Sequence, residues 1–379
     1  MRKICMADPF FSAADRERIH AETDAILDGS LSMGPNVKAF EAEFATLTGV
    51  SHAIAMNSCT SALEAALLAF GPADGREVIL PAETFIATGA AVCQAGYRPV
   101  FAEVSAATLC LELADVAARV TDQTRGVVLV HMAGLITPDI VEFRDYCDSK
   151  GLFLIEDAAH APGAKRGGKR AGAFGHAGCF SFFPTKVMTA GEGGMLTTDD
   201  DALAARVRSL QHRGRNMQSD VEEYSFLGKN IRMTEFAALI GRVQLSHLDE
   251  YLGKRQALAE CYRRELAADK RVTPILSDQP EASSYWKLPV LLPPTIDRAA
   301  TTQRMAAAGV AVDASYQPAL HLQPAFRQLI GTCEGLLPRT EALLSRHLCL
   351  PCHPRMTEDD VAYVASTLSN SLDALAGSR

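Results

Sequence analysis

Short apolar runs alternate with helical segments along the first two-thirds of the chain. Glu77–Leu80, Gly126–His131 and Leu152–Ile155 have the length and composition of buried strands. Ser61–Phe70 and Phe85–Gln94, which adjoin such runs, have helical periodicity. The apolar runs are continuous rather than alternating, which is typical of parallel strands covered on both faces. The pattern predicts an α/β fold with a mostly parallel central sheet.

The pattern changes after about residue 245. Glu235–Ala267 is rich in charge and free of proline, and it predicts one long helix. Trp286–Leu292 is a further apolar run, and Val310–Ala314 predicts a short strand. Thr357–Leu375 predicts a last helix. It begins with a capping box in which Thr357 is the N-cap and Asp360 is the acidic residue three positions later.

This change in pattern suggests two domains. The chain has 379 residues, whereas single domains usually have about 100–200. We expect a larger domain over residues 1–245 and a smaller α+β domain over residues 246–379, bridged by the long helix. The division leaves open that the N-terminal segment packs on the smaller domain. Hydrophobic residues make up 48% of the chain and charged residues 22%, which is enough apolar material for sizeable cores.

Charge and targeting signals narrow the classes of partner. The net charge of −8 disfavours binding to nucleic acid and to anionic membranes. The N-terminus lacks the apolar core of a secretory signal, and no apolar run approaches the roughly 20 residues of a spanning helix. We therefore expect a cytoplasmic protein with reduced thiols, bound to neither nucleic acid nor membrane.

One cysteine motif resembles a metal-binding sequence. Cys349–His353 has the spacing of a c-type haem attachment site. Such attachment needs export, and no second cysteine pair is present to complete a zinc site. We interpret the segment as a short buried strand, Leu348–Leu350, that ends at a proline, and we expect no metal site.

The strongest chemical signal lies between residues 152 and 199. Asp157 follows a predicted strand, where ligands bind at the carboxyl edge of an open α/β sheet. Lys186 follows a Phe-rich segment, and burial there lowers the pKa of the amine and makes it nucleophilic. A glycine-rich turn, Gly191–Gly194, comes next. Together they suggest pyridoxal 5'-phosphate, with a Schiff base at Lys186 and Asp157 keeping the pyridine nitrogen protonated.

A phosphate site and an aromatic neighbour accompany this pair. Asn57–Ala62 joins a predicted strand to a helix, and small hydroxyl residues at a helix N-terminus favour anion binding. Alone this is a weak signal, because Ser and Thr are common helix caps. Phe85 follows another strand end and is a candidate to stack on the pyridine ring, with core packing as the alternative.

Asp157–Ala161, Gly175–Lys186 and Gly191–Gly194 strongly resemble segments of the DegT/DnrJ/EryC1/StrS family. The members of this family are fold-type-I pyridoxal-phosphate enzymes, chiefly sugar aminotransferases. The resemblance implies a large domain with a mostly parallel sheet and a smaller α+β C-terminal domain. It extends over nearly the whole chain and includes Ser30–Pro35, Phe40-Glu41, Asn57–Leu67, Asn230–Glu235, Tyr316–His321 and Leu350–Pro354.

The resemblance implies a role for each matching residue. Lys186 would carry the cofactor, Asp157 would pair with the pyridinium, and His160 would lie beside the phenolic oxygen. Asn230 would reach the phosphate from the neighbouring subunit, which implies a homodimer with shared active sites. The full set of implied cofactor contacts is Thr60, Ser61, Phe85, Asp157, His160, Ser181, Lys186 and the neighbouring subunit's Asn230.

Lys186 also bears on the reaction. In some family members, which are dehydratases, histidine replaces this lysine, so a lysine favours aminotransfer. The resemblance implies a ping-pong transfer from an amino acid, L-glutamate, to a keto-sugar that is nucleotide-linked. Other pyridoxal-phosphate chemistry on the same scaffold is the alternative, such as sugar dehydration or amination of a non-nucleotide keto-cyclitol. A non-catalytic regulator is a third hypothesis, which the complete site set argues against.

The sequence departs from the family pattern on either side of Asn230 and over residues 211–215. These regions help to shape the sugar and nucleotide pocket. Basic residues here are candidates for diphosphate contacts, with a solvated surface role as the alternative for each. The candidate substrate contacts are Lys229, Arg232, Arg213, Arg215, Tyr316 and His321.

Overall fold

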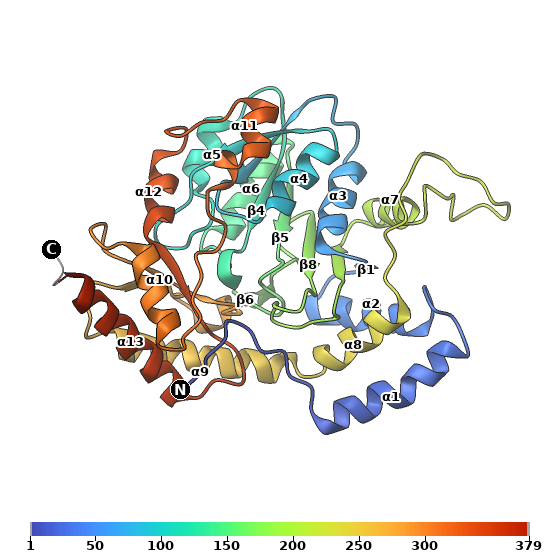
Figure 1. The fold of residues 1–379 in the computed structure, drawn as a ribbon. Coiled ribbons are helices and arrows are strands. Elements are labelled where there is room, and N and C mark those ends of the chain that lie inside the picture. Colours follow the sequence, from blue (N-terminus) through green and yellow to red (C-terminus); the bar gives the residue numbers. More distant parts are fainter. Residues whose placement is uncertain (1, 377–379) are drawn as a thin grey trace.

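The computed structural model describes residues 2–376, and its centre is a seven-stranded sheet (Figure 1). In spatial order the strands are β1 (His52–Met56), β9 (Gly194–Thr198), β8 (Ala177–Ser181), β5 (Phe153–Asp157), β4 (Thr124–Val130), β2 (Glu77–Pro81) and β3 (Arg98–Ala102). Neighbouring strands are parallel except at β9, which is antiparallel to β1 and to β8. The predicted α/β fold with a mostly parallel sheet is confirmed.

Helices cover both faces of this sheet, and each face has its own core. One face carries α3 (Cys59–Ala69), α4 (Ile86–Gln94) and α7 (Asp201–Gln211). The other carries α2 (Pro35–Thr48), α5 (Leu113–Arg119), α6 (Ile140–Lys150) and α8 (Glu235–Leu245). Within β4, Val128 packs in the first core, whereas Val127 and Leu129 pack in the second. Burial on both faces therefore explains the continuous apolar run.

The C-terminal part forms a smaller assembly beside the sheet (Figure 1). Its elements are α9 (Leu248–Leu266), α10 (Arg298–Ala307), α13 (Glu358–Ala376) and an antiparallel sheet of β10 (Thr273–Pro274), β11 (Leu288–Leu291) and β12 (His347–Leu350). Its core includes Ile4, which pairs with Val310, so the N-terminal segment packs here. Phe326, on α11 (Pro324–Ile330), packs instead in the α3–α4 core. The domain boundary at residue 245 stays a prediction.

The remaining elements connect or border these two parts. They are α1 (Ala13–Leu27), the two-stranded β6 (Lys165–Arg166) and β7 (Lys169–Arg170), α12 (Pro338–Arg346), and the short 3₁₀ turns Met132–Gly134, Pro280–Ala282 and Leu320–Leu322. Helix α1 was not predicted, because it buries only Asp15 and Ile26 and therefore shows no apolar stripe. Within residues 2–376, no helix combines the length and the apolar character needed to cross a membrane.

Two predicted elements differ from the structure. The single helix predicted over Glu235–Ala267 is two helices, α8 and α9, with the break at Ser246 and His247. His247 Nε2 lies 2.8 Å from Asp15 Oδ1 of α1, a long-range contact that helical periodicity does not reveal. The segment Val310–Ala314 is not a regular strand, because it makes only isolated bridges to Ile4 and to Cys349.

A buried carboxylate joins the starts of α2 and α8. The Glu235 side chain is 1% exposed and accepts hydrogen bonds from the backbone N–H groups of Gly34, Asn36 and Val37 over 2.7–2.9 Å. These donors belong to the first turn of α2, which has no acceptor of its own for them. A Cβ at Gly34 would lie 2.9 Å from Glu235 Cδ, so this close approach requires glycine. Glu235 therefore holds the N-terminus of α2 against the N-terminus of α8.

We expect Glu235→Ala to lower the free energy of unfolding by about 3 kcal/mol, because three backbone donors lose a charged acceptor. The matched control is Glu22→Ala. Glu22 is partly exposed and pairs with Arg18 one helical turn away, so its loss should cost less than about 0.5 kcal/mol. Urea unfolding at one fixed protein concentration measures both variants. Equal costs for the two substitutions would contradict this role for Glu235.

Candidate active site

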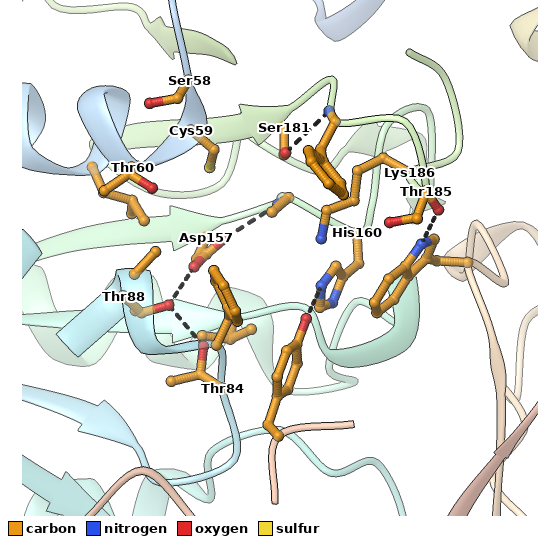
Figure 2. Close-up of a pocket in the computed structure, with 18 of the residues that line it drawn as sticks. Ser58, Cys59, Thr60, Thr84, Thr88, Asp157, His160, Ser181, Thr185 and Lys186 are labelled. Carbon is orange, nitrogen blue, oxygen red and sulfur yellow. Dashed lines mark hydrogen bonds between the residues drawn. The ribbon is translucent and has the colours of Figure 1, made fainter. Parts of the chain in front are cut away.

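A cavity of about 390 Å³ opens at the carboxyl edge of the parallel strands (Figure 2). It lies between the start of α3, the loop from β2 to α4, the ends of β5 and β8, and two C-terminal segments around residues 286 and 316. The structure brings together seven of the predicted site residues on its walls: Thr60, Phe85, Asp157, His160, Ser181, Lys186 and Tyr316. Figure 2 shows Lys186, Asp157 and His160 converging on this space.

Asp157 is the last residue of β5 and is 5% exposed. Thr88 Oγ1 donates to Asp157 Oδ2 over 2.8 Å, and the Ala159 N–H donates to Oδ1 over 3.2 Å. Burial raises the pKa of Asp157 above its ordinary value, although these hydrogen bonds and the charge of Lys186 oppose the rise. A further cation in the cavity would favour the ionised carboxylate, so Asp157 is suited to a positively charged ring nitrogen.

Lys186 projects into the same cavity from the segment after β8. Burial lowers the pKa of its amine to about 8, with a smaller contribution from the charge of Lys287, while Asp157 acts in the opposite direction. Near neutral pH an appreciable fraction of this amine is therefore unprotonated. An unprotonated amine can attack a carbonyl group or accept a proton.

His160 is held between two aromatic side chains. Its ring stacks on Trp286 with 3.9 Å between ring centroids, and its Nε2 lies 2.8 Å from Tyr316 Oη. Burial, followed by the charges of Lys186 and Lys287, holds the pKa of His160 well below its ordinary range. The imidazole is therefore neutral. Its Nδ1 is buried and has no hydrogen-bond partner among the described residues, so the chain leaves one polar atom of the site unsatisfied.

The start of α3 supplies the candidate phosphate site. Ser58 caps the helix: its Oγ accepts from the Ser61 N–H over 3.1 Å and donates to Ser61 Oγ over 3.0 Å. Thr60 lines the cavity, whereas Ser61 is not on its wall. A Cβ at Gly194 would lie 2.3 Å from the Ser58 carbonyl carbon, so the glycine-rich turn lets β9 approach the helix start. The predicted phosphate contacts of Thr60, Ser61 and Ser181 stay predictions.

The predicted substrate contacts are scattered. Lys229 forms an ion pair with Glu64 of α3, Arg213 and Arg215 are exposed, and Arg232 lines a separate groove beside α8. His321 is not on the cavity wall: its side chain is fully buried and its Nε2 lies 2.9 Å from Glu341 Oε1. The substrate contacts expected from the sequence stay predictions.

Several cavity residues were not predicted. Trp286, the only tryptophan of the chain, stacks on His160 and donates from Nε1 to the Thr185 carbonyl over 2.6 Å. Lys287 follows it on the cavity wall. No sequence signal points to either one, because Trp286 lies about a hundred residues from Thr185 and Lys186, and Lys287 reaches the cavity beside it. Thr84 and Thr88 do carry a signal, since both follow the end of β2 at the carboxyl edge of the sheet, where ligands bind.

We expect the Lys186 amine of the cofactor-free protein to titrate near pH 8, against about 10.4 for an ordinary lysine, because the cavity desolvates the ammonium. Brief acetylation between about pH 6 and pH 11, followed by peptide mass spectrometry, measures the reactive fraction. Exposed Lys270 serves as the internal reference for the reagent. Reactivity at Lys186 should rise as the pH passes through 8, and a midpoint above 10 would show a solvated ammonium.

Comparisons with known proteins agree with this geometry. Residues 13–369 match the DegT/DnrJ/EryC1/StrS aminotransferase family. GDP-perosamine synthase of Caulobacter vibrioides is 36% identical over 346 residues, 90% of this chain and 91% of that protein. The dTDP-3-amino-3,4,6-trideoxy-alpha-D-glucose transaminase of Streptomyces venezuelae is 35% identical over 347 residues, 90% of this chain and 89% of that protein. The solved structure of S. venezuelae DesV has a TM-score of 0.87 at 32% identity, covering 97% and 98% of the two chains. The chain belongs to the DegT/DnrJ/EryC1/StrS aminotransferase family.

Proposed function

We propose that this aminotransferase uses pyridoxal 5'-phosphate to move an amino group from L-glutamate to a nucleotide-linked keto-sugar. The observation that carries the proposal is the shared cavity of Lys186 and Asp157 beside the start of α3. An amine with a lowered pKa, a buried carboxylate and a helix N-terminus match the aldehyde, the ring nitrogen and the phosphate of this cofactor. The names of the two curated relatives support the sugar-nucleotide part of the proposal.

The residues present fit the cofactor. The cavity of about 390 Å³ has the size of an ordinary small-molecule site. Lys186 would hold the aldehyde carbon, Asp157 the ring nitrogen, and Thr60 and Ser181 the phosphate, with Phe85 and His160 beside the ring. When bound, pyridoxal phosphate supplies an electron sink for the carbanion chemistry of amino transfer.

The chain itself supplies proton transfer and orientation. Lys186 Nζ, with a pKa of about 8, would take a proton from the α-carbon of the donor. In the second half-reaction the same amine would deliver a proton to the acceptor carbon that receives the amino group. Asp157 would stabilise positive charge at the ring nitrogen, and Thr88 orients the Asp157 carboxylate by its hydrogen bond. His160 stays neutral between Trp286 and Tyr316, so it offers a hydrogen bond without adding charge beside the amine.

The proposed enzyme works as a homodimer with shared active sites. Asn230 is exposed and lies outside the cavity of its own subunit. The segment between α7 and α8 projects away from the body of the molecule, as the yellow-green loop of Figure 1 shows. It carries exposed Val221, Tyr224 and Leu227, the last of them fully exposed. Exposed apolar side chains on a projecting segment favour contact with a second copy of the chain.

The first test locates the cofactor and the reaction. Borohydride reduction of protein loaded with pyridoxal phosphate should attach the label to the peptide that contains Lys186. Lys186→Ala should lose this label and at least about 10⁴-fold in turnover, since both attachment and proton transfer depend on the amine. The matched control is Lys165→Ala, at an exposed lysine of β6.

Nitrogen-15 glutamate and a panel of nucleotide-linked 3-keto and 4-keto sugars then identify the acceptor by mass spectrometry of the products. Transfer of the heavy nitrogen to none of these sugars would overturn the proposed acceptor class. A label on another lysine would overturn the role of Lys186.

The second test addresses shared active sites. Lys186→Ala and Asn230→Ala dimers should each be weakly active, whereas a co-refolded mixture should regain about one quarter of wild-type activity. In an equal mixture half of the dimers are hybrids, and each hybrid keeps one intact site. Lys186→Ala mixed with Asp157→Asn is the control, because both changes damage the site of their own subunit and no intact site forms. A mixture no more active than its components would place Asn230 outside the neighbouring site.

A further inference from the structure

The cavity contains a second lysine, Lys287, which has no role in the proposed cofactor binding or proton transfer. Its side chain is only 12% exposed and lies on the cavity wall directly after Trp286. Lys287 Nζ lies 4.2 Å from the Trp286 ring centroid, and Lys186 Nζ lies 4.3 Å from the same centroid. The charge of Lys287 also contributes to lowering the pKa of both Lys186 and His160. The two amines therefore belong to one site.

Fixed contacts hold Lys287 in place. Its Nζ donates to Asp313 Oδ2 over 2.6 Å and to Ser315 Oγ over 3.0 Å, and Ser315 Oγ donates to Asp313 Oδ1 over 2.9 Å. An ammonium group has three N–H donors, and these contacts use two of them. The described residues provide no hydrogen-bond acceptor for the third. Lys287 is thus a positioned cation with one donor available at the cavity.

An amino-acid donor requires such a cation. Its carboxylate is bonded to the same carbon as the reacting amine, which would replace Lys186 at the aldehyde carbon of the cofactor, so both groups enter the cavity together. A carboxylate taken out of water needs a charged partner. The described residues that line the cavity include no arginine, and His160 is neutral. With Lys186 engaged in the reaction, Lys287 is the cation that remains among the described residues of this cavity wall.

We propose that Lys287 binds the α-carboxylate of the amino donor. The inference rests on the proposed aminotransferase function and assigns the donor side of the same site. Asp313 holds the ammonium against Trp286, so the donor meets a preorganised charge. Because the acceptor is a ketone without this carboxylate, Lys287 acts in the donor half-reaction and not in the acceptor half-reaction.

Ping-pong kinetics separate the two halves, and this makes the assignment testable. The donor half-reaction converts bound pyridoxal phosphate to pyridoxamine phosphate. Its extent is measured by absorbance at increasing concentrations of L-glutamate. Lys287→Met, which keeps an apolar chain against Trp286, should raise the apparent Kd for glutamate at least about 10-fold, because a charge-assisted hydrogen bond is lost. The apparent Kd for the keto-sugar in the second half should change less than about 2-fold. Lys287→Arg should recover part of the glutamate affinity, and Lys165→Met should change neither half.

A second measurement tests the α-carboxylate itself. Wild-type protein should prefer L-glutamate to 4-aminobutyrate, which lacks that carboxylate, and Lys287→Met should lose most of this preference. Equal weakening of both half-reactions, or weakening of the sugar half alone, would overturn the assignment in favour of a structural or diphosphate-binding role. An unchanged glutamate affinity in a variant that still loads pyridoxal phosphate would also overturn it. If none of the amino acids tested converts the cofactor of the wild-type protein, the proposed function is wrong, and this inference is wrong with it.

Discussion

Keeping the Lys186 amine largely out of water is the physical constraint on which the active site depends. Ammonium groups strongly favour hydration, so the enclosed lysine shifts toward its neutral form. Asp157 limits this shift, because its negative charge stabilises the protonated amine from across the cavity. The balance leaves the amine near its transition at physiological pH, where proton gain and proton loss are both inexpensive. A solvated lysine would stay protonated, and a fully isolated one would bind protons too weakly.

The parallel sheet makes this balance possible by bringing distant segments to one edge. Asp157 ends β5, Ser181 ends β8, and the segment after β2 supplies Thr88, which orients the carboxylate. Strands buried on both faces have little freedom to shift register, so these positions are fixed by the two cores on either side. Trp286 then joins the C-terminal part to the same point, through its hydrogen bond to Thr185 beside the lysine.

Local signals explain which features were predictable from the sequence. The placement of Asp157 and Lys186 could be predicted because each follows a recognisable apolar run, and such runs also indicate a mostly parallel sheet. The strand order and the antiparallel β9 carry no such local signal. Trp286 and Lys287 could not be predicted, since they reach the cavity only through tertiary packing of the C-terminal segment. The same limit applies to contacts made far along the chain. His321 belongs to a matching motif, yet its side chain pairs with Glu341 and is not on the cavity wall. His247, at the break between α8 and α9, contacts α1, and helical periodicity does not encode such a contact.

The position of the single tryptophan gives this protein a built-in optical reporter. Indole emission responds to the polarity and charge around the ring, and Trp286 stacks on His160 with both lysine ammonium groups within 4.3 Å of its centroid. No other tryptophan contributes to the signal, so excitation selective for indole reads the cavity alone. Entry of a molecule or a change of charge in the cavity therefore changes the fluorescence of the unmodified chain, without a label or an added chromophore.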